Sequence, residues 1–275
     1  MTMGDAEDLG EDLPPQEFWD RRLAVHFTLR GAGCRMLGWQ YNAWLYRLRR
    51  RVFMRHVRRL DVAWPAARVA DIGSGTGFYI ELWRRLGVRS VVGVDFAPTA
   101  VERLRARYPQ VQVVLADISR PLAEDLGGPF DAISAMDVLF HIMDDAGYVQ
   151  ALQTLSRLLV PGGYLLFTDC FVRGTVPRAP HCVWRPLDTI VSWLEAASLR
   201  PVLRAPVFVV MNAPVASRRP WAHRLWESLC GLVRAGEPLG FLAGAVLYPL
   251  ELVLTSLLRE SPSTELMICR KQAGP

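Results

Sequence analysis

A glycine-rich loop and several aspartates are the residues of this chain best suited to hold a ligand. The loop directly follows a short apolar run at 69–72 and reads Gly73, Ser74, Gly75, Thr76 and Gly77. Small residues let the backbone turn tightly and approach a ligand closely. Asp71 belongs to that apolar run, whereas Asp95, Asp117 and Asp137 fall at or just beyond the ends of three later runs. If the runs are parallel strands, their ends meet in one crevice.

Each carboxylate suits a different part of one ligand. Asp95 can accept hydrogen bonds from both ribose hydroxyls of a nucleoside, and Asp117 can accept one from an adenine amino group. Asp71 would repel a phosphate but attract the ammonium group of an amino acid. The dinucleotide fingerprint needs its last glycine at the position that Phe78 occupies. Ribose, adenine and an amino-acid ammonium together describe S-adenosylmethionine.

The region from 68 to 169 alternates apolar runs with helical patterns, which is typical of parallel βαβ units in a doubly wound α/β sheet. The predicted strands cover 69–72, 90–95, 111–116, 130–135 and 164–168. The predicted helices cover 79–86, 98–108 and 146–159. Ligands of such sheets bind beyond the carboxyl ends of the strands, near the switch in strand order.

Four motifs in this order resemble those of the class I S-adenosylmethionine-dependent methyltransferases. The likeness is carried by 69–77, 92–96, 116–118 and 130–139, and by the turn at 159–165 into the fifth strand. Besides the glycine loop, the cofactor-binding residues that the resemblance implies are Asp71, Asp95, Phe96, Asp117, Ile118 and Met136. Phe96 would lie against the adenine ring.

The resemblance also implies a Rossmann-like sheet of seven strands whose last strand is antiparallel. The apolar runs at 207–211 and 265–269 would be the last two strands, and 214–262 would be a helical insertion before the last one. We therefore divide the chain into an acidic disordered tail at 1–17, an N-terminal helical cap at 18–64, and a methyltransferase domain at 65–275.

A few further side chains are candidates for the chemistry and for substrate binding. His141 lies just past the fourth strand and is the candidate general base, needed only if the acceptor must lose a proton; the alternative is a histidine that orders the cofactor loop. His181 and Arg185 can bind a substrate carboxylate or phosphate, with a salt-bridged loop as the alternative. Tyr41 can close over the methionine end of the cofactor.

Two segments outside the core have unusual compositions. A predicted helix at 39–60 is rich in arginine, which favours a solvated basic face and leaves a patch for anionic lipid or nucleic acid as the alternative. The stretch 239–258 is nearly as apolar as a spanning helix, but Pro249 and Glu251 disfavour spanning. We expect a lid that packs with the N-terminal helices over the strand ends. A dimer interface and peripheral membrane contact remain open.

Composition limits the classes of protein to which this chain can belong. Hydrophobic residues make up 51% of the chain, and the net charge of +5 is too small to indicate a nucleic-acid partner. The five cysteines show no C-x-x-C spacing, so we expect no metal site. An odd, scattered set of cysteines fits reduced thiols in the cytoplasm.

These observations predict a cytoplasmic enzyme, monomeric or homodimeric, that transfers a methyl group from S-adenosyl-L-methionine to a small hydrophobic or aromatic metabolite. O-methylation is favoured, and N- and C-methylation stay open. The alternatives are a membrane-surface methyltransferase for a lipid or quinone, a nucleic-acid methyltransferase, and a non-catalytic cofactor-binding protein. A base-modifying enzyme would usually carry an Asn/Asp-Pro-Pro-aromatic run where this sequence has Met136-Asp137-Val138-Leu139.

Overall fold

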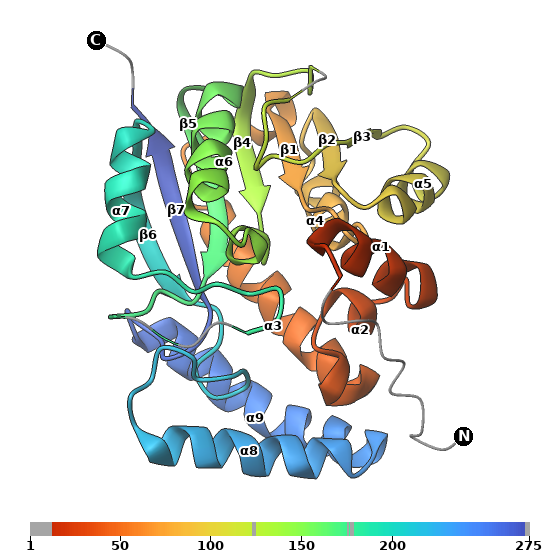
Figure 1. Cartoon of the computed structure of the whole chain (residues 1–275), viewed down its shortest axis with the longest axis vertical. Coiled ribbons are helices and arrows are strands. Elements are labelled where there is room, and N and C mark those ends of the chain that lie inside the picture. Colours follow the sequence, from red (N-terminus) through yellow and green to blue (C-terminus); the bar gives the residue numbers. More distant parts are fainter. Residues whose placement is uncertain (1–12, 123–124, 175, 177–178, 273–275) are drawn as a thin grey trace.

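A seven-stranded mixed sheet forms the centre of the computed structural model (Figure 1). The structure describes residues 13–122, 125–174, 176 and 179–272, so most of the predicted acidic tail at 1–17 lies outside the described residues. The strands are β1 (Arg68–Ile72), β2 (Ser90–Asp95), β3 (Gln112–Leu115), β4 (Phe130–Ala135), β5 (Leu159–Asp169), β6 (Leu199–Pro206) and β7 (Glu265–Lys271).

The strand order confirms the predicted fold. It runs β3-β2-β1-β4-β5-β7-β6, with β7 antiparallel to both of its neighbours and the remaining pairs parallel. The order switches direction between β1 and β4, and Asp71 of β1 is in register with Gly93 on one side and Ser134 on the other. A ligand crevice is expected beyond the carboxyl ends of these strands.

Alternating side chains bury both faces of the sheet. Val69 and Leu166 belong to one core cluster, whereas the adjacent Ala70 and Leu165 belong to the other. The first cluster is covered by α3 (Gly38–Val57), α4 (Phe78–Leu86) and α5 (Pro98–Arg107). The second is covered by α6 (Asp145–Leu158) and α7 (Leu187–Ala196). Burial on both faces explains why the strands read as continuous apolar runs.

The N-terminal helices lie beside the carboxyl ends of the strands (Figure 1). They are α1 (Pro15–Val25), α2 (Leu29–Ala32) and α3, with 3₁₀ turns η1 (Arg35–Leu37) before α3 and η2 (Trp64–Ala66) after it. The first turn of α3 is capped from a distance, because Glu237 accepts hydrogen bonds from the backbone N–H groups of Trp39 at 3.0 Å and Gln40 at 2.9 Å. A carboxylate at a helix N-terminus is favourable for the helix dipole as well.

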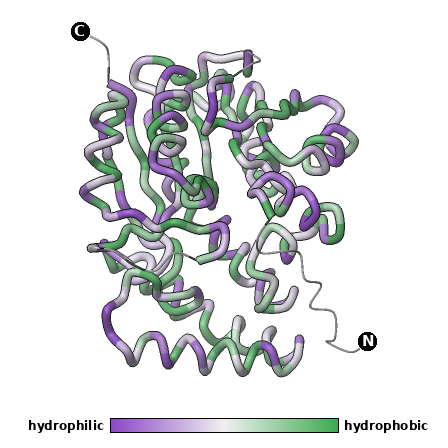
Figure 2. Tube along the Cα trace, viewed as in Figure 1, coloured by the Kyte–Doolittle hydropathy of each residue, from purple (hydrophilic) through white to green (hydrophobic). Residues whose placement is uncertain are grey.

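The late insertion forms two helices, α8 (Pro220–Arg234) and α9 (Glu237–Leu257). Figure 2 shows hydrophilic and hydrophobic residues alternating along the turns of α8. Gly244 lets α9 lie directly on α3, since a Cβ there would come within 2.2 Å of the Trp44 ring. Glu251 of α9 is fully buried and accepts hydrogen bonds from the backbone N–H groups of 209–211.

The hydrogen bonds of Glu251 explain why one sequence prediction is wrong. The apolar run at 207–211 is no strand, and the sixth strand is β6 at 199–206. The N–H groups of Val209 and Met211 bind Glu251 at 2.7 and 3.0 Å rather than a neighbouring strand. The β-rich composition of the run therefore reflects burial between the sheet edge and α9.

Among the described residues, α9 is the one helix long and apolar enough by length and composition to cross a membrane. Of the most apolar 18-residue stretch of α9, 28% is buried inside the protein. The bond network of Glu251 and the close contact of Gly244 with Trp44 tie α9 to the rest of the fold.

Candidate functional site

A cavity of about 870 Å³ opens beyond the carboxyl ends of β1, β2 and β4. Its lining comes from the glycine loop, from the turns after β2, β3 and β4, and from α1 and α3. Cavities of this size are typical of small-molecule and cofactor sites. The predicted convergence of the strand ends on one crevice is therefore observed.

Each of the three glycines of the loop is favoured at its position for a structural reason of its own. All adopt left-handed backbone angles, with φ of +64° at Gly73, +51° at Gly75 and +81° at Gly77. A Cβ at Gly73 would meet Val138 at 2.3 Å, and one at Gly77 would meet Tyr108 at 2.7 Å. A Cβ at Gly75 would meet no atom closer than 3.8 Å. Gly75 thus leaves open space beside the cavity, whereas the other two allow close packing.

Asp95 and Asp117 reach the cavity from neighbouring strand ends. Asp95 is buried, and its two oxygens accept hydrogen bonds from the backbone N–H groups of Gly75 at 2.7 Å and Ala97 at 2.9 Å. The Asp95 carboxylate therefore fixes the glycine loop while its remaining lone pairs stay available. Burial raises the pKa of Asp95. Asp117 is held by Ser119, whose N–H and hydroxyl both donate to it.

Asp71 lies buried directly beneath the loop. Its Oδ1 accepts a hydrogen bond from the Ser134 hydroxyl at 2.6 Å. Its Oδ2 has no hydrogen-bond partner among the described residues. Burial raises the pKa of Asp71 to about 7. An unsatisfied buried carboxylate oxygen is costly, and a cationic ligand group nearby would relieve that cost.

Most predicted cofactor residues come together at the cavity. Those that line it are Gly73, Ser74, Gly75, Thr76, Asp95, Phe96, Asp117, Ile118 and Met136. Gly77 stands behind the loop against α5, and Asp71 stands beneath it. The prediction that Tyr41 closes over the cofactor is wrong. Tyr41 is fully buried and does not line the cavity, and its hydroxyl donates to the carbonyl oxygen of Met211 at 2.9 Å. Tyr46, one turn and a half further along α3, lines the cavity instead.

His141 lines the same cavity at the end of the 3₁₀ turn η3 (Leu139–His141). Its Nδ1 lies 2.6 Å from the carbonyl oxygen of His181, so the neutral ring donates there and carries its lone pair on Nε2. Burial lowers the pKa of His141 to about 4. The imidazole is therefore neutral at physiological pH, and Nε2 has no hydrogen-bond partner among the residues that the structure describes.

His181 and Arg185 do not form the predicted substrate pair. Arg185 donates through Nε to Asp145 at 2.8 Å and through Nη2 to the carbonyl oxygen of Ile142 at 3.0 Å, and its side chain is buried. His181 is buried and stacked on Phe18 with ring centroids 4.0 Å apart. Neither residue lines the cavity. The salt-bridged loop is the correct interpretation for Arg185, and His181 serves His141 through its main-chain oxygen.

One residue of the cavity, Trp19, and the contacts of another, Asp137, were not predicted from the sequence. Trp19 of α1 lines it, packs edge-on against His141 with ring centroids 4.8 Å apart, and carries a buried Nε1 without a partner among the described residues. Asp137 forms an ion pair with the buried Arg49 of α3 and accepts a hydrogen bond from the Thr168 hydroxyl at 2.8 Å. The periodicity of α1 and α3 indicated only their packing faces, and spacing along the chain gave no signal for these contacts.

Comparison with known proteins now adds to this geometry. Residues 69–163 match the family model described as a methyltransferase domain. This part of the chain is a methyltransferase domain. A relative named ubiquinone biosynthesis O-methyltransferase, from Xanthomonas oryzae pv. oryzae, is 39% identical over 163 residues, which is 52% of this chain and 65% of that protein. The chain thus spans less than two thirds of this relative. A protein of the same name from Acinetobacter baumannii is 36% identical over 105 residues, 37% of this chain and 43% of that protein.

Solved structures share the fold of the methyltransferase domain at low sequence identity. Magnesium protoporphyrin IX methyltransferase from Synechocystis PCC 6803, solved with bound S-adenosylmethionine, has a TM-score of 0.56 at 12% identity and covers 94% of this chain and 98% of its own. The [4+2]-cyclase SpnF has a TM-score of 0.53 at 20% identity and covers 82% of this chain and 81% of its own. The shared fold therefore does not decide the reaction.

The donor set of the methyltransferase domain fits S-adenosylmethionine. Asp71 Oδ2, which has no hydrogen-bond partner among the described residues, can attract the ammonium group of the cofactor. The open space beside Gly75 can admit the methionine portion of the cofactor. Asp95 can accept from the ribose hydroxyls, while Phe96 and Ile118 can enclose the adenine. In the part of the chain that the structure describes, no group of three or more potential metal ligands occurs.

We predict that cofactor affinity rises about tenfold between pH 6 and pH 8, because only ionised Asp71 attracts the ammonium group. Burial raises the pKa of Asp71 to about 7, so the free protein carries the proton below that pH and must release it on binding. Calorimetric titration with S-adenosylhomocysteine at several pH values measures this dependence. Asp71→Asn should bind more weakly and without the pH dependence. An affinity in the wild-type protein that is constant over this range would contradict the assignment.

Proposed function

We propose that this protein transfers the methyl group of S-adenosyl-L-methionine to a phenolic hydroxyl of a small hydrophobic molecule. The observation that carries the proposal is the neutral His141, which is held by its Nδ1 in the cavity wall and whose Nε2 has no hydrogen-bond partner in the described part of the chain. When bound, the cofactor supplies an electrophilic methyl group on a sulfonium. The protein has to position the acceptor and remove its proton.

The surroundings of His141 support an aromatic acceptor. The cavity that His141 lines is also lined by Trp19, Tyr46, Phe78 and Tyr79, and Trp19 packs edge-on against the His141 ring. Flat aromatic walls favour stacked or edge-on contact with another ring. The 870 Å³ volume lies toward the upper end of the range of about 300–1,000 Å³ that is usual for small-molecule sites. Asp137 lines the same cavity and forms an ion pair with Arg49, so its charge is compensated within the protein.

The two relatives named ubiquinone biosynthesis O-methyltransferase support the same class of acceptor. Their names point to an oxygen acceptor on a quinone-type ring. A catechol or hydroquinone presents a hydroxyl beside an apolar ring, which suits both the aromatic walls and the imidazole. We therefore propose catechols and hydroquinones with apolar substituents as the acceptor class of this chain.

A panel of acceptors tests the proposal. Purified protein is incubated with S-adenosylmethionine and with a catechol, a hydroquinone, a matched aniline and an aliphatic alcohol, and the products are identified by mass spectrometry. We expect methyl ethers from the first two acceptors. Methylation of the aniline alone would overturn the assignment of an oxygen acceptor. Tight binding of S-adenosylhomocysteine without any product from the panel would favour a non-methylating use of the fold.

A further inference from the structure

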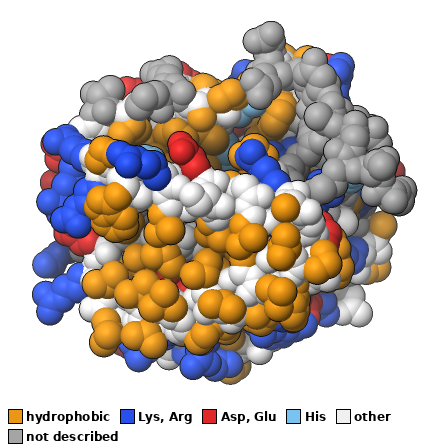
Figure 3. Space-filling view, turned by 90° about the horizontal axis from the view of Figure 1, so that it is seen from below, with side chains coloured by type: hydrophobic (Ala, Val, Ile, Leu, Met, Phe, Trp, Pro, Cys, Tyr) orange, Lys and Arg blue, Asp and Glu red, His pale blue; other side chains and the backbone are white. Residues whose placement is uncertain are grey.

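The surface of α8 and α9 is unusually apolar. Of the 16 exposed large hydrophobic side chains in the described part of the chain, 11 lie between 221 and 258. They are Trp221, Leu225, Leu232, Leu239, Phe241, Leu242, Val246, Leu250, Val253, Leu257 and Leu258. Figure 3, seen from the side on which α8 and α9 lie in Figure 1, shows hydrophobic side chains gathered over one face, with basic side chains at its edges. We call these residues the α8–α9 face. Contiguous apolar patches of this kind mark interaction sites.

The α8–α9 face is held in place by the fold and does not cover the cavity. No residue of α8 or α9 appears in the lining of the 870 Å³ cavity, so the sequence expectation of a lid is wrong. The two carboxylates of α9 both bind backbone N–H groups, Glu237 at the start of α3 and Glu251 at 209–211. The exposed apolar side chains of α9 therefore stand on a helix that is anchored to the fold, and Val246 and Leu257 are 71% and 75% exposed.

A stripe of arginines on α3 borders this face. Arg47, Arg51 and Arg55 are spaced four residues apart, so they lie on one side of the helix. Arg47 lies 4.2 Å above the Trp44 ring, which in turn contacts Tyr248 of α9 at a centroid distance of 5.2 Å. Arg55 donates to the carbonyl oxygen of Thr255 at 3.2 Å. None of the ion pairs found among the described residues includes an arginine of this stripe.

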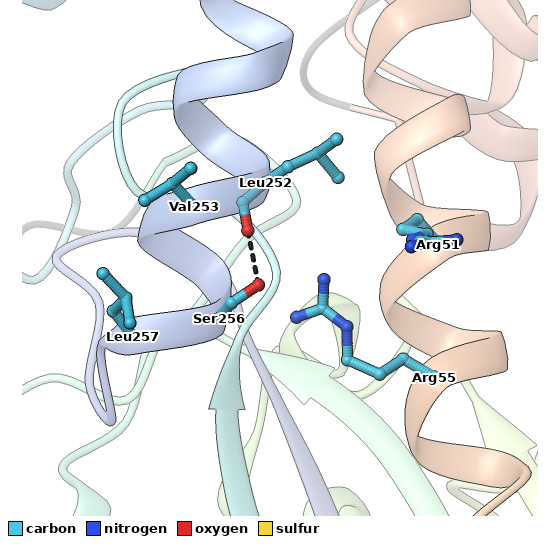
Figure 4. Close-up of a pocket in the computed structure, with 6 residues that line it drawn as sticks. All are labelled: Arg51, Arg55, Leu252, Val253, Ser256 and Leu257. Carbon is cyan, nitrogen blue, oxygen red and sulfur yellow. Dashed lines mark hydrogen bonds between the residues drawn. The ribbon is translucent and has the colours of Figure 1, made fainter.

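A small pocket joins the stripe to the α8–α9 face. It encloses about 340 Å³ and is lined by Arg51, Arg55, Leu252, Val253, Ser256 and Leu257. Figure 4 shows Arg55 reaching from α3 toward Ser256 on α9, with Val253 and Leu257 on the far side of the helix. Burial, followed by the charges of Arg51 and Arg59, lowers the pKa of Arg55. The charges of these arginines therefore repel one another, and no carboxylate among the described residues forms an ion pair with Arg51 or Arg55.

We propose that the α8–α9 face docks on an anionic phospholipid bilayer, with the Arg51–Arg55 pocket taking a lipid phosphate. Apolar side chains at the headgroup boundary and basic side chains beside them are the two features that interfacial helices combine. Guanidinium groups match phosphate geometry well. A second copy of the chain is a poorer occupant, because pairing two such faces would bring two uncompensated arginine stripes together. This docking is independent of the methyl-transfer reaction.

Vesicle sedimentation tests the proposal with the full chain. The probes are vesicles of phosphatidylcholine alone and of phosphatidylcholine mixed with phosphatidylglycerol. We expect the wild-type protein to sediment with the mixed vesicles and to be released by salt. Arg51→Gln combined with Arg55→Gln should lower the partition coefficient about thirtyfold, since each basic residue contributes a similar share at an anionic surface. Val253→Asp combined with Leu257→Asp should abolish sedimentation.

Matched controls separate docking from misfolding and from dimer formation. Arg89→Gln with Arg200→Gln removes two exposed arginines outside the stripe, and Val202→Asp charges an apolar side chain that is 50% exposed on β6. We expect both controls to sediment like the wild type. Absence of sedimentation with mixed vesicles would overturn the proposal. A stable dimer in sizing chromatography that Val246→Asp dissociates would also overturn it, in favour of an interface between two copies.

Discussion

His141→Ala is expected to lower kcat for a phenolic acceptor by about 10² to 10⁴, with little change in cofactor affinity. The imidazole lines the cavity, and its Nδ1–H is engaged by the carbonyl oxygen of His181, so its Nε2 is the atom available to take the acceptor proton. The measurement is the steady-state rate at saturating S-adenosylmethionine, together with calorimetric binding of S-adenosylhomocysteine.

A conservative variant distinguishes proton transfer from packing. His141→Asn retains an N–H group that can reach the carbonyl oxygen of His181 but lacks a basic nitrogen. We expect it to be as slow as His141→Ala, while keeping the thermal stability of the wild type. If His141→Asn turned over at close to the wild-type rate, the histidine would be ordering the cavity wall and the base would lie elsewhere.

The pH profile gives an independent readout of the same residue. Burial lowers the pKa of His141 to about 4, so the ring stays neutral and able to accept a proton down to that pH. At saturating cofactor, kcat/KM for a neutral phenol is therefore expected to hold steady from pH 8 down to pH 6. A fall in kcat/KM with a midpoint near the ordinary histidine pKa of about 6.5 would contradict this environment for His141.

Asp95→Ala is expected to weaken S-adenosylhomocysteine binding by about 10² to 10⁴, since two charge-assisted hydrogen bonds to ribose contribute about 1.5–3 kcal/mol each. The structure adds a second reason, because Asp95 also accepts from the N–H of Gly75 and so shapes the loop on which the cofactor rests. Calorimetric titration measures the affinity, and circular dichroism verifies that the variant is folded.

Asp131→Ala is the matched control for the Asp95 variant. Asp131 accepts a hydrogen bond from the backbone N–H of Arg68 at 2.8 Å, and it does not line the cavity. Its removal costs a carboxylate–amide hydrogen bond of the same kind without touching the ligand. We expect Asp131→Ala to lose some stability and to bind S-adenosylhomocysteine like the wild type. Equal loss of affinity in both variants would show that the Asp95 effect is structural.

Local sequence was sufficient for the sheet and for most of the cofactor side of the cavity. Gly73, Asp95 and Asp117 sit where buried apolar runs end, and the ends of adjacent parallel strands have to meet. The strand at 130–135 was predicted with the same bounds that β4 has. These features depend on periodicity and on turn chemistry, which act over a few residues and can therefore be recognised in the sequence alone.

The acceptor side of the cavity and the outer helices were decided by contacts between distant segments. Tyr41 and Tyr46 both lie on α3, but the first donates to the carbonyl oxygen of Met211 and the second lines the cavity. Glu251 lies 40 residues from Met211, yet it takes the backbone N–H groups that would otherwise have joined a strand. A buried carboxylate must satisfy its oxygens wherever donors are within reach. Such pairings follow from packing in three dimensions, and no spacing along the chain encodes them.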